Sequence, residues 1–156
     1  MAQIKSPLKE QAIQGVAVEL QSSLVEMIDL SLLGKQAHWN VFGPNFLSLH
    51  QQLDTLVDAF RLLSDEMAER CVTLGVSPDG LAKTVASHSR LDPLPPGRIP
   101  DAQAIELMCD RMGTVIQRQR ERLEKIEAQD PVTHDLFIKS LETLEKHHWM
   151  LRSQKA

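Results

Sequence analysis

Side chains that can bind metal ions are concentrated in the second quarter of the chain. Two histidines, His38 and His50, precede a series of acidic residues, and no lysine lies between residues 50 and 69. At about 100° per residue, one helix face would hold His50 together with Asp54, Asp58, Asp65 and Glu69. Glu66 falls about 160° from His50 and is interpreted as an ordinary surface charge. Imidazole nitrogens and carboxylate oxygens together suit iron, zinc or manganese, although a charged, solvated helix face has the same pattern.

The spacing along the helix divides these candidates into two half-sites. Asp54 and Asp65 are separated by roughly 16 Å at about 1.5 Å per residue, which is too far to hold one ion or a close pair of ions. One half-site is His50 with Asp54, to which His38 can be added, and the other is Asp65 with Glu69. The halves can meet if the same helix of a second subunit packs antiparallel across a two-fold axis, so that each interface holds two equivalent sites.

The alternative is a metal ion bound in the core of a single helical bundle. Such centres draw Glu-x-x-His motifs from two helices, and this sequence has one such motif, from Glu145 to His148. The sequence therefore favours a site between subunits over a site within one chain.

The sequence predicts that the metal-capable residues lie on long helices. Apolar residues recur at helical spacing after Pro7, and the turn-forming residues from Asn40 to Asn45 predict that this first helix ends near residues 39–43. A second helix is predicted from about residue 44 to residue 71 or 74, where Gly75 stops it. The stretch up to residue 100 is rich in proline and glycine, and it is interpreted as a crossover connection with a short helix over residues 81–87.

Two further helices are predicted after the crossover. Asp101 is expected to cap a helix that runs to about Ile126, and Asp130 is expected to cap one that begins at Pro131 and runs to Leu151. The absence of tyrosine and the 4% aromatic content disfavour a sheet protein. The predicted fold class is all-α, a ferritin-like four-helix bundle with a short helix in the long crossover between helices two and three. We expect one such domain over residues 10–152, between short tails at 1–9 and 153–156.

Composition and charge exclude several classes of protein. A chain of 156 residues with 42% hydrophobic and 24% charged residues fits one globular domain and excludes wholesale disorder. No run of about 18 apolar residues is present, and the first residues lack the apolar core of a secretory signal, so we expect a cytoplasmic protein. Cys71 and Cys109 are expected to be buried, free thiols. The net charge of -4 gives no general affinity for nucleic acid or for an anionic membrane.

The metal-capable segment resembles the signature of the Dps family, the mini-ferritins of bacteria. The resemblance is carried by HWNVFGPNF at residues 38–46, by Leu49-His50 and Leu53-Asp54, and by DEMAER at residues 65–70, and it continues to Trp149. It implies a hollow homododecamer whose ferroxidase sites lie between two-fold-related subunits. Position by position, it implies that the metal ligands and catalytic residues are His38, His50 and Asp54 from one subunit with Asp65 and Glu69 from its partner.

The same resemblance implies the chemistry of the site. Fe(II) would be oxidised by hydrogen peroxide or dioxygen, and the Fe(III) mineral would be stored inside the shell, with zinc able to substitute for iron. Because peroxide consumed in this way yields less hydroxyl radical, storage would also protect against oxidative damage. Trp39, beside His38, either intercepts stray oxidising equivalents or packs as an interface aromatic.

Acidic residues near the last helix are the candidates for an ion pore. In the family such residues line pores at three-fold axes, and the matching positions are Asp130, Asp135 and Glu145. Rings of these carboxylates would concentrate cations. Helix capping by Asp130 and solvated charge at the other two positions are the alternatives. The remaining histidines of this helix could add metal donors at the pore, with surface or packing positions as the alternative: His134, His147 and His148.

DNA binding is the weakest implication of the resemblance. Family members that bind DNA use lysine-rich tails, whereas the first nine residues here contain only Lys5 and Lys9. We therefore expect weak and strongly salt-sensitive DNA binding. The alternative function is a DNA-coating nucleoid protein that uses its metal sites mainly for assembly.

Overall fold

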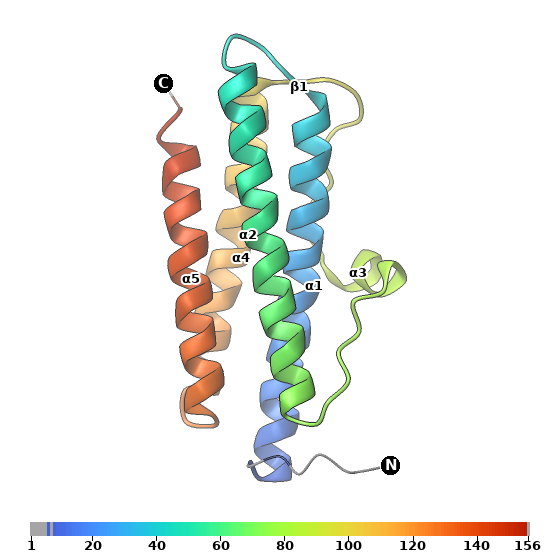
Figure 1. The fold of residues 1–156 in the computed structure, drawn as a ribbon, viewed down its shortest axis with the longest axis vertical. Helices are drawn as coiled ribbons and strands as arrows, with labels where there is room; N and C mark the ends of the chain where they lie inside the picture. Colours follow the sequence, from blue (N-terminus) through green and yellow to red (C-terminus); the bar gives the residue numbers. More distant parts are fainter. Residues whose placement is uncertain (1–5, 7, 156) are drawn as a thin grey trace.

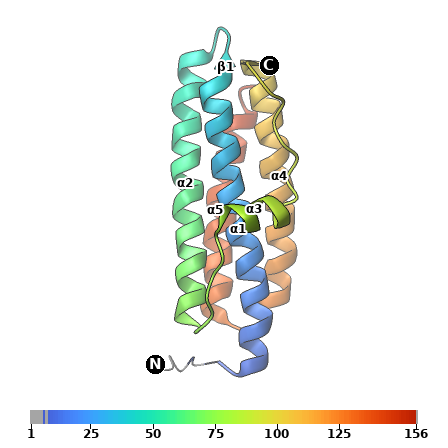
Figure 2. The same cartoon turned by 90° about the vertical axis from the view of Figure 1, so that its right-hand side faces the viewer.

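Two antiparallel helical hairpins pack together into a four-helix bundle (Figure 1). The computed structural model describes residue 6 and residues 8–155. Helices α1 (Glu10–Asn40) and α2 (Phe46–Thr73) form one hairpin, and helices α4 (Asp101–Ile126) and α5 (Pro131–Arg152) form the other. The connection between the hairpins returns along the bundle and carries the short helix α3 (Ala82–His88) on its outside (Figure 2). The predicted all-α four-helix bundle with a helix in the crossover is confirmed.

Apolar side chains at helical spacing form the bundle core in two clusters. One lies toward the α1–α2 turn and includes Leu30 and Leu53, and the other lies toward the opposite end and includes Leu20 and Phe137. Each of these large side chains, fully removed from water, stabilises the fold by about 1.5–3 kcal/mol. Both cysteines are buried and free, as predicted, and burial raises the pKa of Cys71 to about 11. Within the described residues, no helix is apolar over a length sufficient to cross a membrane.

Two short strands that the sequence pattern did not predict tie the hairpins together. Strand β1 (Val41–Phe42) follows α1 directly and pairs in parallel with strand β2 (Ile99–Pro100), which runs directly into α4. The predicted cap of α4 is therefore wrong by one position. Pro100 occupies the N-cap, and Asp101 is the first helical residue.

The start of α5 agrees with the prediction. The carboxylate of Asp130 accepts hydrogen bonds from the backbone N–H groups of Val132 and Thr133, both at 3.3 Å. Arg70, in the last turn of α2, places its Nη2 2.5 Å from the same carboxylate. Burial alone would raise the pKa of Asp130, but the hydrogen bonds from Thr133 and Arg70 outweigh burial and lower it. A buried ion pair thus joins the ends of α2 and α5.

Candidate metal centre

The turn between α1 and α2 brings the histidines together. His38 lies in the last turn of α1, and His50 and Asp54 lie in the first turns of α2. The chain reverses direction between them over a few residues, so side chains that are far apart on a single helix become neighbours across the hairpin (Figure 1).

This turn is fixed by a glycine and by the first residue of α4. Gly43 has a φ of 137°, which favours glycine, and a Cβ at this position would lie 2.6 Å from the carboxylate of Asp101. The same carboxylate accepts hydrogen bonds from the N–H groups of Asn45 and Ala102, both at 2.8 Å. The hydrogen bond from Asn45 holds the pKa of Asp101 below its ordinary value. The carboxylate is therefore ionised at neutral pH and clamps the turn to α4.

The two histidines hold each other through the main chain. Nδ1 of His38 lies 2.9 Å from the carbonyl oxygen of His50, and Nδ1 of His50 lies 3.0 Å from the carbonyl oxygen of His38. Because a carbonyl oxygen can only accept, each Nδ1 carries a proton and donates it. Nε2 of each ring is then free to bind a metal ion through its lone pair. The rings stack with centroids 3.6 Å apart and an interplanar angle of 20°.

Asp54 completes a group of three potential ligands. One ligand atom from each of His38, His50 and Asp54 lies within 4.8 Å of the other two, and the described residues contain no other group of three His, Cys, Asp or Glu side chains placed in this way. Lys35 of α1 forms an ion pair with Asp54, and its hydrogen bond lowers the pKa of that carboxyl group. The side chain of His38 is 8% exposed and that of Asp54 is 45% exposed, so the group opens to solvent on its Asp54 side.

Asp65 and Glu69 are not part of this group. Both are exposed on α2, which runs without a break from Phe46 to Thr73, so Asp65 remains roughly 16 Å from Asp54 along the helix. Asp65 also lines an open groove of about 660 Å³ between α1 and α2, beside the exposed side chain of Leu62. The isolated chain therefore presents one clustered set of ligands and, separately, one pair of exposed carboxylates.

The predicted pore residues have different surroundings. Asp130 is 3% exposed and its carboxylate is bound within the chain, which favours its capping role. Glu145 forms an ion pair with Arg120 of α4, while Asp135 is exposed on α5. The ring of pore carboxylates stays a prediction, and Asp135 is the member whose side chain is free to face a pore.

The other residues singled out in the sequence lie outside the ligand group. Trp39 is 70% exposed, so its indole does not pack within its own subunit. Lys9 is exposed immediately before α1, and Lys5 lies outside the described residues. Burial lowers the pKa values of His147 and His148 on α5.

The sequence analysis missed two residues that organise the centre. Lys35 lies three residues before His38, and this helical spacing places both residues on one face of α1. That spacing is the sequence feature from which a position of Lys35 beside the histidine could have been predicted. The sequence pattern predicts Asp101 only as a helix cap, and no local pattern shows that its carboxylate also binds the turn before α2.

Comparison with known proteins identifies similar chains. The ferritin-like domain family matches residues 18–155. The DNA protection during starvation protein 2 of Deinococcus radiodurans is 37% identical over 86% of this chain and 56% of its own length, so the chain spans little more than half of that relative. The DNA protection during starvation protein of Mycolicibacterium smegmatis is 35% identical over 94% of this chain and 80% of its own length. A solved structure of Dps from Microbacterium arborescens, described as a high iron form, is 26% identical, covers 96% of this chain and 97% of its own chain, and superposes with a TM-score of 0.91.

Proposed function

Because this chain belongs to the Dps branch of the ferritin-like family, we propose that it is a ferroxidase and iron-storage protein that oxidises Fe(II) at sites between subunits. The observation that carries the proposal is the group of His38 on α1 with His50 and Asp54 on α2, which lies apart from Asp65 and Glu69 farther along α2. A second subunit, packed across a two-fold axis, supplies Asp65 and Glu69 to complete each site. A relative whose structure is described as a high iron form supports iron as the metal.

Each ligand contributes a distinct property to the reaction. The carboxylates of Asp54, Asp65 and Glu69 supply negative charge that favours Fe(III) over Fe(II) and so assists loss of an electron. Nε2 of His38 and of His50 binds Fe(II) as a neutral donor, because Nδ1 of each ring is committed to a backbone carbonyl. Two Fe(II) ions each release one electron, and one hydrogen peroxide molecule accepts both electrons with two protons to give two water molecules. Dioxygen is the alternative oxidant.

Storage requires a closed shell and a path for iron. Twelve subunits enclose the mineral, and light scattering that finds only monomers or dimers under physiological conditions would contradict this assembly. Asp135 and its symmetry mates form the cation path. Asp135→Asn is then expected to slow iron uptake at low ionic strength by a few-fold, with the difference shrinking as salt screens the field. An unchanged uptake rate at low salt would assign Asp135 to ordinary surface charge.

Mixing two inactive variants tests the shared site. One variant lacks His50 and Asp54, and the other lacks Asp65 and Glu69. If the two variants are unfolded, mixed equally and reassembled, about half of the two-fold pairs combine one of each. Such a pair has one intact site and one site with both halves destroyed. Peroxide-driven iron oxidation is therefore expected to return to about a quarter of the wild-type level.

Each variant reassembled with itself is the control and is expected to remain inactive. A site within one chain would leave every subunit broken, and mixing would restore nothing. A mixture with verified mixed subunits that stays at the level of its parents would contradict the shared site.

The relatives named DNA protection during starvation proteins support a second candidate function, coating of DNA. Lys9 and Lys155 are the exposed lysines of the described tail residues, and the chain carries a net charge of -4. We expect only weak DNA retardation in a gel shift, lost at moderate salt. Tight binding that persists at physiological salt together with no peroxide-driven iron oxidation would favour the DNA-coating function instead.

A further inference from the structure

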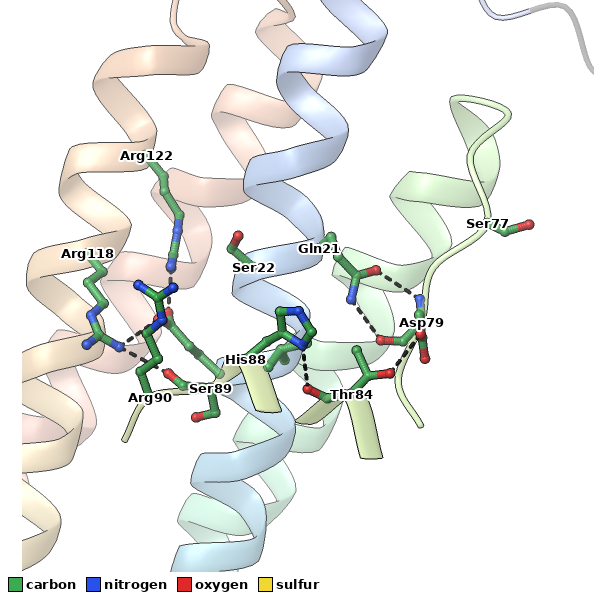
Figure 3. Close-up of a pocket in the computed structure, with 12 residues that line it drawn as sticks. Gln21, Ser22, Ser77, Asp79, Thr84, His88, Ser89, Arg90, Arg118 and Arg122 are labelled. Carbon is green, nitrogen blue, oxygen red and sulfur yellow. Dashed lines mark hydrogen bonds and ion pairs between the residues drawn. The ribbon is translucent and has the colours of Figure 1, made fainter. Parts of the chain in front are cut away.

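A pocket of about 650 Å³, with many polar side chains in its lining, lies between α1, α4 and the crossover connection (Figure 3). Gln21, Ser22 and Glu26 of α1 contribute to it, and Arg118 and Arg122 of α4 form one side. The crossover forms the other side with its own polar residues: Ser77, Asp79, Thr84, His88, Ser89 and Arg90. No residue of this pocket belongs to the proposed iron site.

Hydrogen bonds fix the crossover over α1. The side chain of Gln21 donates to the carbonyl oxygen of Asp79 at 2.7 Å and accepts from its N–H at 2.9 Å. The hydroxyl of Ser89, at the end of α3, donates to the carboxylate of Asp29 at 2.5 Å. Each end of α3 is thus tied to the same helix, which makes the pocket a defined cavity of the fold.

Three guanidinium groups converge at the α4 side of the pocket, as Figure 3 shows for Arg90, Arg118 and Arg122. The carboxylate of Glu26 lies among them, and Glu19, which does not line the pocket, places its Oε2 3.7 Å from Nε of Arg122. Glu26 accepts from Nη1 of Arg118 at 2.9 Å and from Nη1 of Arg122 at 2.5 Å. Glu26 is 4% exposed and is shared between two cations, so the three guanidinium groups outnumber the two carboxylates, Glu26 and Glu19, at this end of the pocket.

Donor groups remain free at this end. Within the part of the chain that the structure describes, the hydrogen bonds of Arg118 all leave from Nη1, to Glu26 and to the carbonyl oxygen of Ser89. Its Nη2 and Nε are left for another acceptor. Arg90 has no ion pair among the same residues, and its backbone φ of 57° lies in the left-handed region, which the other non-glycine residues there do not adopt.

We propose that this pocket binds a small phosphate-bearing anion, held by the free guanidinium donors of Arg90 and Arg118. Guanidinium groups bind tetrahedral and planar oxyanions through paired hydrogen bonds. Phosphate is favoured over a carboxylate because it carries between one and two negative charges near neutral pH and offers more acceptor oxygens, which match two guanidinium groups. The site does not depend on the proposed ferroxidase function.

Titration of the assembled, iron-free protein with inorganic phosphate at constant ionic strength tests the proposal. Calorimetry or phosphorus NMR is expected to show saturable binding of one phosphate per chain. Arg90→Gln is expected to weaken this binding at least tenfold, and Arg90→Lys to weaken it less because the charge is kept while the paired geometry is lost. Arg90 is the residue to change because it lines the pocket and its side chain forms no ion pair or hydrogen bond among the described residues that its loss would break.

Arg98→Gln is the matched control. Arg98 is an exposed arginine on the same connection, placed 4.5 Å over the ring of Phe42 and outside the pocket, so its loss changes the net charge equally. It is expected to leave phosphate binding unchanged. Absence of saturable binding, an equal loss in Arg98→Gln, or an affinity for acetate that equals the affinity for phosphate would each overturn the proposal.

Discussion

The two halves of the proposed iron site are organised in opposite ways. In the first half, His38 and His50 are locked by reciprocal hydrogen bonds to each other's main chain, and Asp54 is held by Lys35. In the second half, Asp65 and Glu69 are exposed, and neither side chain has a hydrogen-bond partner within the described residues. The first half is therefore preorganised by its own subunit, whereas the second takes its final geometry only when another subunit packs against it.

Because of this difference, the first half contributes to the stability of its own subunit and the second half does not. Removing side chains of the first half breaks contacts that also stabilise the hairpin, while removing carboxylates of the second half breaks none within the subunit. Substitutions in the first half should consequently change both the stability of the subunit and its activity, whereas substitutions in the second half should change activity alone.

Replacing both carboxylates of the second half gives the largest effect. Asp65→Asn with Glu69→Gln is expected to reduce Fe(II) oxidation by about 100-fold or more, because two anionic ligands are lost. The free energy of unfolding is expected to change by less than about 0.5 kcal/mol, as for exposed side chains in general. Glu66→Gln is the control, since Glu66 lies between them but pairs with Lys139 on α5. A large loss of stability in the double variant would contradict the contrast.

Gly43→Ala disturbs the first half through the turn that positions it. The left-handed φ and the contact with Asp101 are expected to lower the free energy of unfolding by about 1–3 kcal/mol, measured by urea denaturation at fixed protein concentration. Gly97→Ala is the matched control, because Gly97 has a φ of 86° but open space around the added methyl group. Equal losses in the two variants would show that the contact with Asp101 has no effect.

The clamp on the turn is expected to depend on pH. The pKa of Asp101 is lower in the folded protein than its ordinary value of about 3.9, so the ionised carboxylate stabilises the fold above that pH. This contribution is lost as the pH falls through the folded pKa. Asp101→Asn should therefore be less stable than the wild type at pH 7, and the gap should close at acid pH. A gap that is constant across the range would contradict the ionic clamp, with Asp92→Asn on the exposed crossover as the control.

Lys35→Met gives the smallest expected effect. Lys35 competes with a metal ion for Asp54, so its removal is expected to raise the affinity for zinc, used as a redox-inert probe, by roughly two- to fivefold. Lys139→Met, which breaks a comparable ion pair with Glu66 away from the site, should have no effect. A weaker affinity in Lys35→Met would show that the lysine supports metal binding rather than competing with it.

The fold was largely predictable because its signals are local. The apolar repeat, the glycine and proline residues after Leu74, and the Asp130-Pro131 pair mark the helix ends within a few residues of those observed. The pairing of Val41 with Ile99 was not predictable, since two residues carry no strand periodicity and their partner lies across the whole crossover.

The clustering of His38, His50 and Asp54 was predictable for the same reason, because the three residues are close along the hairpin, while their role as a half-site stays a prediction. The side chains that hold the cluster were not predictable. Lys35 reaches Asp54 only in the particular register between α1 and α2, and Arg70 reaches Asp130 only after both hairpins have packed. Contacts of this kind depend on tertiary geometry that no short sequence pattern specifies.

The reciprocal bonds between His38 and His50 also affect how the site tolerates mutation. In many metal sites a side chain, often a carboxylate, orients the ligand histidine, and a single substitution of that carboxylate releases the ring. Here each Nδ1 has the carbonyl oxygen of the other histidine as an acceptor, which every amino acid supplies, although Oδ1 of Asp54 also lies 3.3 Å from Nδ1 of His38. No substitution at a third position can delete either acceptor. The backbone of the hairpin therefore supplies an acceptor for each ring, and neighbouring positions such as Trp39 can vary without removing either carbonyl acceptor.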